Sequence, residues 1–285
     1  MFKKLFGLAP KLESDGSYSP SKLALKLGTK DKTDYTPVSY QKYSGEKSKI
    51  LVICTEEKNM TMKNGKMFST GNHPVEALLP MLHLQNAGFE FEIATPNGKP
   101  TIFEMWAFPE KDVYVNAIYK ELKPQFLKPK KLSDIVQQWF SDSSSYAAVF
   151  VPGGHGAMLG IPEDKNVGKI LRWAKERDIF TITLCHGPGS LLTTTLDGQK
   201  FIYEGYKMAV FPDSVDKQTP MIGYLPGQMP FGLSEKLKAL GAKLMNTKSD
   251  DTVCHDRELI TGASPLASNN LGKLAAETLL RELKN

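Results

Sequence analysis

Regular alternation of apolar and amphipathic segments begins near residue 49. Segments 50–54, 89–94, 147–151 and 179–184 are rich in β-favouring apolar residues and predict strands, most of them buried on both faces. Between and after them, residues 73–87, 165–177, 234–240 and 271–283 place apolar side chains at helical spacing. Short strands are expected at 208–210 and around Cys254 and Ile260. This order predicts an α/β fold, in which helices sandwich a parallel sheet and ligands bind at the carboxyl ends of its strands.

Two stretches lack this alternation of strand and helix patterns. Residues 1–48 are rich in Ser, Lys, Thr and Tyr, and we interpret them as an N-terminal arm. Residues 97–145 form a Lys-rich insertion that contains Trp106 and Trp139. The insertion is long enough to build a small cap subdomain together with the arm. We therefore expect an α/β catalytic domain over 49–285, with the arm and the insertion contributing to the cap.

Composition narrows the class of protein. The chain has 285 residues, of which 41% are hydrophobic and 24% charged, as in ordinary globular proteins. Residues 1–50 hold ten Lys and five acidic residues, whereas the other 235 residues carry 26 charges of each sign. Because positive and negative charges balance over residues 51–285, we expect no dedicated nucleic-acid groove there. The three cysteines form no disulfide framework, the first apolar run stops at Pro10, and no segment is long enough to span a membrane. These features predict a cytoplasmic protein.

The strongest chemical signal is Cys185. It follows an apolar strand and precedes Gly187-Pro188 and a helix expected to open near Gly189, which is the arrangement of a nucleophile elbow. The positive end of that helix would lower the pKa of the thiol and favour a reactive thiolate. A lone cysteine is more often a buried structural residue, and we prefer that interpretation for Cys54 and Cys254. For Cys185 the strand terminus and the adjacent His186 favour catalysis.

Three further groups are expected near the same strand ends. Gly153 and Gly154, followed by His155, would let backbone N–H groups point at a developing oxyanion, although a plain tight turn is also glycine-rich. Glu76 lies in the first turn of a predicted helix and either complements the helix dipole or exchanges a proton with the thiol. Asp213 either orients His186 or is a solvated loop residue.

Four ordered motifs carry a resemblance to a known family. They are STGNHPVE at 69–76, VPGGHG at 151–156, LCHGP at 184–188 and FPDSVDKQTP at 211–220. The chain resembles the HchA-type protein deglycases, glutathione-independent glyoxalases and holding chaperones in the heat-shock branch of the ThiJ/PfpI superfamily. The resemblance covers about residues 45–285 and implies a flavodoxin-like fold related to class I glutamine amidotransferases.

By position, the resemblance implies roles for individual residues. Cys185 would be the nucleophile, Glu76 its acid/base partner, and His186 with Asp213 the rest of a triad-like set. Gly154 and its neighbours Gly153 and His155 would form the oxyanion site. The family also implies a homodimer, a role in stress response and DNA repair, and a metal site of two histidines and a carboxylate. The matching positions here are Gln85, Glu90 and Leu122, so we expect no metal.

The leading hypothesis is a cysteine-dependent glyoxalase or deglycase, a hydrolase or lyase that needs no cofactor. It would convert methylglyoxal or glyoxal to hydroxy acids such as D-lactate, acting on them free or as early adducts on Cys, Lys and Arg of proteins or on nucleotides. Two alternatives stay open. One is a holding chaperone that binds unfolded proteins on exposed apolar surface, and the other is a small peptidase that uses the same cysteine.

Overall fold

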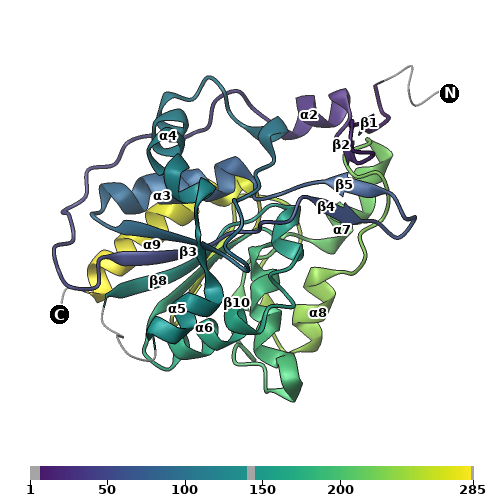
Figure 1. Ribbon diagram of the computed structural model, residues 1–285. Coiled ribbons are helices and arrows are strands. Elements are labelled where there is room, and N and C mark those ends of the chain that lie inside the picture. Colours follow the sequence, from purple (N-terminus) through teal and green to yellow (C-terminus); the bar gives the residue numbers. More distant parts are fainter. Residues whose placement is uncertain (1–6, 140–144, 284–285) are drawn as a thin grey trace.

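The centre of the protein is a seven-stranded sheet with strand order β12-β13-β9-β8-β3-β6-β7 (Figure 1). The computed structural model describes residues 7–139 and 145–283. All neighbouring strands are parallel except β12, which pairs antiparallel with β13. The bounds are Lys49–Ile53 for β3, Glu90–Thr95 for β6, Lys130–Lys131 for β7, Tyr146–Val151 for β8, Phe180–Leu184 for β9, Val253–Asp256 for β12 and Leu259–Gly262 for β13.

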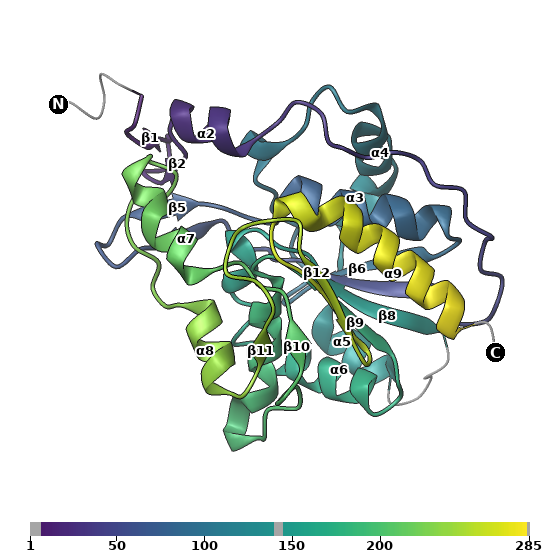
Figure 2. The same cartoon turned by 180° about the vertical axis from the view of Figure 1, so that it is seen from behind.

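Helices cover both faces of this sheet. Figures 1 and 2 show α3, α4 and α9 on one face and α5 and α6 on the other. Their bounds are Pro74–Asn86 for α3, Val113–Leu127 for α4, Leu132–Trp139 for α5, Lys165–Lys175 for α6 and Ser268–Glu282 for α9. Successive residues of β3 alternate between the two layers, because side chains along a strand point to opposite faces. Ile50 and Val52 join the α3/α9 core, whereas Leu51 and Ile53 join the α6 core.

Two smaller sheets and several short helices complete the fold. A four-stranded sheet has the order β1-β2-β5-β4, and a two-stranded parallel sheet pairs β10 with β11. The strands are β1 Lys11–Leu12, β2 Tyr18–Ser19, β4 Asn59–Thr61, β5 Met67–Ser69, β10 Lys207–Met208 and β11 Lys243–Leu244. Among residues 7–139 and 145–283, the remaining helices are α2 Lys22–Gly28, α7 Asp213–Gln218 and α8 Leu233–Ala239, with 3-10 segments η1 Met105–Ala107, η2 His155–Met158, η3 Gly187–Gly198, η4 Thr219–Met221 and η5 Pro265–Ala267.

The arm crosses the helical layer before it enters β3 (Figure 2). The Thr33 N–H and hydroxyl both donate to Asp112, the residue that caps α4, at 3.0 and 2.5 Å. The Asn269 side chain of α9 donates to the Asp34 carbonyl at 3.2 Å. In the insertion, β7 extends the main sheet beside β6 and α5 packs near α6. The division into arm, insertion and catalytic domain stays a prediction, and its residues 1–6, 140–144 and 284–285 lie outside the described part.

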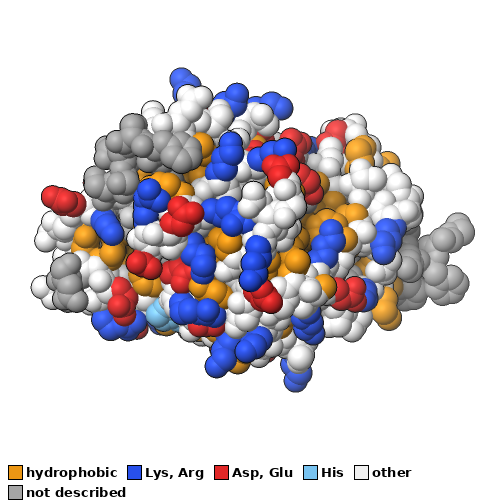
Figure 3. All heavy atoms as spheres, turned by 90° about the horizontal axis from the view of Figure 1, so that it is seen from below, with side chains coloured by type: hydrophobic (Ala, Val, Ile, Leu, Met, Phe, Trp, Pro, Cys, Tyr) orange, Lys and Arg blue, Asp and Glu red, His pale blue; other side chains and the backbone are white. Residues whose placement is uncertain are grey.

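The predicted fold class is confirmed: the sheet is mostly parallel and helices lie on both of its faces. Each of the four long strands appears within one or two residues of its expected bounds. On the face in Figure 3, basic and acidic side chains are interspersed and neither sign covers the surface. Among the described residues, none of the helices has both the length and the apolar character needed to cross a bilayer.

Candidate active site

Cys185 lies on a strained turn at the end of β9. Its φ angle is +60°, in the left-handed region that side chains other than glycine rarely adopt. Backbone hydrogen bonds hold the turn on both sides, since Cys185 N–H donates to Gly262 at 2.8 Å and Phe211 N–H donates to the Cys185 carbonyl at 2.9 Å. The predicted elbow geometry is therefore confirmed, and the thiol points into a cavity at the carboxyl ends of the strands.

Glu76 reaches the thiol from the first turn of α3. Pro74 begins this helix, and the Glu76 side chain is only 1% exposed. A Cβ atom placed on Gly153 would lie 1.7 Å from Glu76 Oε2 and 2.8 Å from Cys185 Cβ. Gly153 is therefore required because the Glu76 carboxyl group occupies the space that any other side chain would need.

Cys185 and Glu76 form a coupled acidic pair. Burial raises the pKa of the Cys185 thiol well above its usual range, and the neighbouring Glu76 carboxylate raises it further. Burial also raises the pKa of Glu76, although the Cys185 thiol and the Gly154 N–H oppose this shift. The pair therefore keeps at least one proton at neutral pH. The expected lowering of the thiol pKa by the following helix is wrong, because burial and the Glu76 carboxylate outweigh any effect of the 3-10 segment η3 that follows.

The partner of His186 is Asp216. His186 Nδ1 lies 3.3 Å from Cys185 Sγ, and His186 Nε2 lies 2.9 Å from Asp216 Oδ2. The other oxygen, Oδ1, lies 3.0 Å from His155 Nε2. Burial alone would raise the pKa of Asp216, but the two imidazoles lower it overall, so the side chain is a carboxylate that only accepts hydrogen bonds. Both histidines must then donate from Nε2, so Nδ1 is the ring atom of His186 that faces the thiol.

The prediction that Asp213 orients His186 is wrong. Asp213 is the first residue of α7, and its two oxygens accept from Ser234 N–H at 3.0 Å and Glu235 N–H at 2.9 Å. It therefore satisfies backbone donors in the first turn of α8. One helical turn later on α7, Asp216 is directed at the histidines instead.

The predicted oxyanion residues separate into different roles. The Gly154 N–H interacts with the Cys185 sulfur, so it is the donor best placed for an oxyanion beside that atom. Gly154 has φ +98°, and a Cβ there would lie 2.4 Å from His73 N. His155 instead directs its N–H to Glu104 and its ring to Asp216.

The cavity above Cys185 has a volume of about 230 Å³. The arm contributes Leu27 and Gly28 to its wall, and η5 contributes Pro265 and Leu266. Its other lining residues come from the turns after β8 and β9, the start of α3, the residue before η1, and the chain after β10, α7 and β11: His73, Glu76, Glu104, Gly154, His155, Cys185, His186, Phe211, Thr219, Tyr224 and Ser249.

Three buried titratable residues in this wall were not expected from the sequence. Burial, aided by His155, lowers the pKa of His73 to about 3, so this imidazole is neutral. Burial raises the pKa of Tyr224 well above its usual range. Glu104 comes from the insertion, where an isolated carboxylate in a Lys-rich stretch gave no signal of its own.

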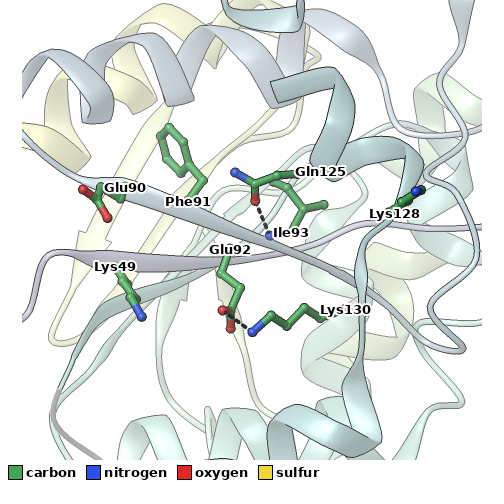
Figure 4. Close-up of a pocket in the computed structure, with 8 residues that line it drawn as sticks. All are labelled: Lys49, Glu90, Phe91, Glu92, Ile93, Gln125, Lys128 and Lys130. Carbon is green, nitrogen blue, oxygen red and sulfur yellow. Dashed lines mark hydrogen bonds and ion pairs between the residues drawn. The ribbon is translucent and has the colours of Figure 1, made fainter. Parts of the chain in front are cut away.

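A second cavity lies at the opposite, amino ends of the strands and has a volume of about 190 Å³. Figure 4 shows that its Glu92 pairs with Lys130, at 3.0 Å, while the Gln125 side chain accepts from Ile93 N–H. Its charged groups lie on β3, β6 and the chain after α4, and they include no cysteine or histidine. We therefore place the chemistry in the Cys185 cavity.

The positions that match the family's metal ligands do not fit a zinc ion. Gln85 donates its amide to Glu121 at 2.7 Å, and Leu122 is buried in the apolar core. Glu90 lies exposed at the start of β6 (Figure 4). Within the described residues, the one cluster close enough to share an ion is His155, His186 and Asp216, with ligand atoms within 4.8 Å. We assign that cluster to proton transfer, because each Nε2 already has the carboxylate as its partner.

Purified protein is expected to contain substoichiometric zinc and to keep its activity after treatment with a chelator. An alkyl group at Leu122 and an amide at Gln85 supply none of the imidazole nitrogens that bind zinc. Elemental analysis and turnover before and after chelation test this. Stoichiometric zinc that is lost together with activity would contradict it.

Comparison with known proteins places these features in a family. No family model matches the chain. Curated relatives from several bacteria carry the name protein/nucleic acid deglycase HchA. The one from Pseudomonas aeruginosa strain UCBPP-PA14 is 48% identical over 268 residues, covering 93% of this chain and 92% of its own. Those from Escherichia coli O157:H7 and Staphylococcus aureus are 46% and 45% identical, over 94% and 97% of this chain and 94% and 95% of their own.

Solved structures agree at the level of the fold. Glyoxalase III from Candida albicans has a TM-score of 0.61 at 21% identity and covers 83% of this chain and 97% of its own. Rapid encystment protein REP24 from Francisella tularensis has a TM-score of 0.67 at 18% identity, with coverage of 81% and 99%. Sequence identity near one half along almost the whole length is decisive: the chain belongs to the HchA family of protein/nucleic acid deglycases.

Proposed function

We propose that this protein is a cysteine-dependent glyoxalase and deglycase. Its substrates would be methylglyoxal and glyoxal, free or as early adducts on Cys, Lys and Arg side chains or on nucleotides. The observation that carries the proposal is a cavity in which the Cys185 sulfur meets the Glu76 carboxyl group and His186 Nδ1. The HchA relatives, whose names state deglycase activity on proteins and nucleic acids, support the same reaction class.

The first step forms a carbon–sulfur bond. The Cys185 thiol gives its proton to Glu76 as the sulfur attacks the aldehyde carbon, C1. The carbonyl oxygen O1 then takes this proton and becomes the hydroxyl of a hemithioacetal. The Gly154 N–H beside the sulfur stabilises the negative charge that develops on O1. His186, held by Asp216, is the alternative acceptor of the thiol proton.

The second stage moves hydrogen within the bound substrate. Glu76, now a carboxylate, removes the C1 proton to give an enediol and returns a proton to the neighbouring carbon, C2. The product is a thioester of a 2-hydroxy acid, which water cleaves to release the acid and the free thiol. Neither stage changes the net number of electrons in the substrate, so the reaction needs no redox partner.

The size of the cavity favours a small carbonyl substrate over a peptide. A volume of about 230 Å³ that leads to a buried thiol accommodates a three-carbon dicarbonyl or the tip of a modified side chain. An extended peptide backbone would need an open cleft along the sheet edge. To test the function, the protein is incubated with methylglyoxal and hydroxy acid formation is followed by chiral chromatography, with a glycated peptide and an unmodified peptide in parallel. Absence of lactate would refute it.

Replacing Glu76 with glutamine is expected to lower turnover of methylglyoxal by at least about 100-fold, because an amide cannot carry the proton between C1 and C2. The pH at which the Cys185 thiol reacts with iodoacetamide should also fall, since the neighbouring carboxylate raises the thiol pKa. Turnover and alkylation rates measured across pH check both effects. Little change in turnover and in the pH dependence of alkylation would indicate that Glu76 only places a negative charge at the start of the helix.

Finer properties of the protein are also proposals. From the family resemblance of the chain we infer a homodimer, D-lactate as the product from methylglyoxal, and a part in stress protection and DNA repair. From its few, dispersed cysteines we infer a cytoplasmic location. Binding of unfolded proteins is a separate activity that the site does not require. Sedimentation of the purified protein and chiral analysis of the product test the first two.

A further inference from the structure

We propose that Glu104 is a second acid–base group of this site, which carries a proton between the two substrate oxygens while Glu76 carries one between the two carbons. The proposal rests on the function proposed above and assigns a residue to a step that Glu76 alone leaves incomplete. Converting the hemithioacetal to the thioester moves hydrogen both from C1 to C2 and from O1 to O2.

The backbone presents Glu104 to the catalytic cavity. Segment 102–104 of the insertion pairs with the loop before α3, where Asn72 N–H donates to the Ile102 carbonyl at 2.8 Å and Glu104 N–H donates to the Asn72 carbonyl at 3.0 Å. The same loop leads through His73 to Glu76, so the two carboxyl groups are fixed by adjoining pieces of backbone. Both line the cavity that contains Cys185.

One oxygen of Glu104 is held by a short hydrogen bond and the other is not. Oε1 accepts from the Thr70 hydroxyl at 2.6 Å, whereas Oε2 is buried and makes no hydrogen bond of regular geometry, although the His155 N–H approaches the carboxyl group; the residue is 1% exposed. Buried carboxyl groups with a structural role have their oxygens satisfied. Glu56 is such a group, since it accepts from Asn97 N–H, the Asn97 side chain and Lys99 N–H. The open oxygen of Glu104 is therefore available to a ligand in the cavity.

The charges around Glu104 suit proton transfer at neutral pH. Burial raises the pKa of Glu104 to about 7, and the charge of His155, the Thr70 hydroxyl and the His155 N–H limit the rise. The other titratable groups that face it are Glu76 on α3 and Tyr224 after η4. A group with this pKa exists in both protonation states near pH 7, as general acid–base catalysis requires.

The steps balance when both carboxyl groups take part. Glu76 removes the C1 proton, the electrons form the C1–C2 double bond, and protonated Glu104 gives its proton to O2, which yields the enediol. Glu104 then takes the proton of O1 as the C1 carbonyl forms, and Glu76 returns its proton to C2. The product is the thioester with a hydroxyl on C2, and both carboxyl groups end in their starting states.

The test compares Glu104→Gln with wild type in a methylglyoxal assay. We expect turnover at pH 7 to fall at least about 100-fold, the lower range for a lost acid–base group, with KM changed by less than about threefold. Alkylation of Cys185 by iodoacetamide should keep its rate, because the first step does not use Glu104. Wild-type kcat/KM should decline as pH rises through about 7, and the variant should lack this decline. Turnover within about threefold of wild type would overturn the proposal, as would an equal loss in alkylation.

Two more variants separate catalysis from structure. Glu56→Gln makes the same change at a buried carboxylate that bonds to the same insertion but does not line the cavity, and it should keep both turnover and pH profile. Glu104→Asp keeps an ionisable group and should retain the pH dependence at an intermediate rate, and an Asp variant without that dependence would overturn the proposal. If wild type forms no lactate, the proposed function itself fails, which is distinguishable from an active wild type with an active Glu104→Gln variant.

Thermal unfolding gives a readout that does not depend on turnover. A carboxyl group whose pKa is raised from 4.5 to about 7 in the folded state costs stability as pH rises across that interval, because the unfolded chain loses the proton first. Glu104→Gln should therefore melt at a higher temperature than wild type at pH 8, and the difference should shrink toward pH 5. Glu56, whose pKa is lowered overall, should show the opposite sign at pH 8 when changed to Gln. Equal melting temperatures of wild type and Glu104→Gln at pH 8 would contradict the buried, ionisable state that the proposal needs.

Discussion

Replacing Cys185 with alanine is expected to lower methylglyoxal turnover by at least about 1,000-fold, in the range seen when an enzyme loses its nucleophile. The free energy of unfolding should change by no more than about 1 kcal/mol, because only one sulfur atom is removed from the edge of a cavity. Steady-state assays and thermal melts of the two proteins measure both quantities. The combination would identify the sulfur as a reactive group rather than a packing group.

Cys254→Ala is the matched control. Cys254 is half-buried on β12, outside the catalytic cavity, so the same substitution should leave turnover unchanged. Residual activity of the Cys185 variant above about a tenth of wild type would refute the nucleophile assignment. Equal losses in both variants would point to a general effect of removing a thiol.

The second large effect is expected for Asp216→Asn, which should lower turnover by about 100-fold or more. An amide offers one oxygen to one imidazole and an NH2 group to the other, so one histidine must shift its proton to Nδ1. If His186 shifts, its Nδ1 no longer faces the Cys185 sulfur as an acceptor. The same substitution in a serine protease triad is costly for this tautomeric reason. Turnover and the pH dependence of alkylation report on it.

Asp213→Asn provides the comparison within the same helix. Asp213 accepts from the backbone at the start of α8, so its variant should lose about 1 kcal/mol of stability and keep turnover within about threefold. A larger loss of turnover in the Asp213 variant than in the Asp216 variant would show that the histidines have a different carboxylate partner in solution.

The sequence was most informative where a local pattern of residues is enough to define a strand, a turn or the start of a helix. Runs of apolar and β-branched residues gave β3, β8 and β9 nearly to the residue, because strands buried on both faces are built almost wholly from such side chains. The polar members of β9, Thr181 and Thr183, are themselves β-branched. The strand-to-turn transition at Cys185 was also predictable, since an apolar run ends there against two glycines and a proline within four residues. Glu76 was found through the helix that starts at Pro74.

Prediction failed where side chains meet through tertiary structure. The motif at 211–220 contains both Asp213 and Asp216, and the sequence predicts no helix there, whereas the structure forms α7. On a helix, residues three apart project toward neighbouring but distinct groups, so one carboxylate reaches α8 and the other reaches the histidines. Glu104 was not predicted as a site residue because its position depends on a backbone pairing between segments some 30 residues apart. Such a pairing produces no periodic pattern in the sequence.

The left-handed backbone at Cys185 also affects which residues evolution favours at this position in related proteins. A side chain at φ +60° costs roughly 1 kcal/mol or more that glycine would avoid, and only the reactivity of the sulfur compensates for that cost. When a descendant copy is no longer selected for turnover, glycine or asparagine at position 185 becomes the more stable choice and selection for folding favours it. A relative that keeps Glu76 and the glycine turn but carries Gly or Asn in place of this cysteine therefore marks a lineage that retains the fold for a purpose other than catalysis.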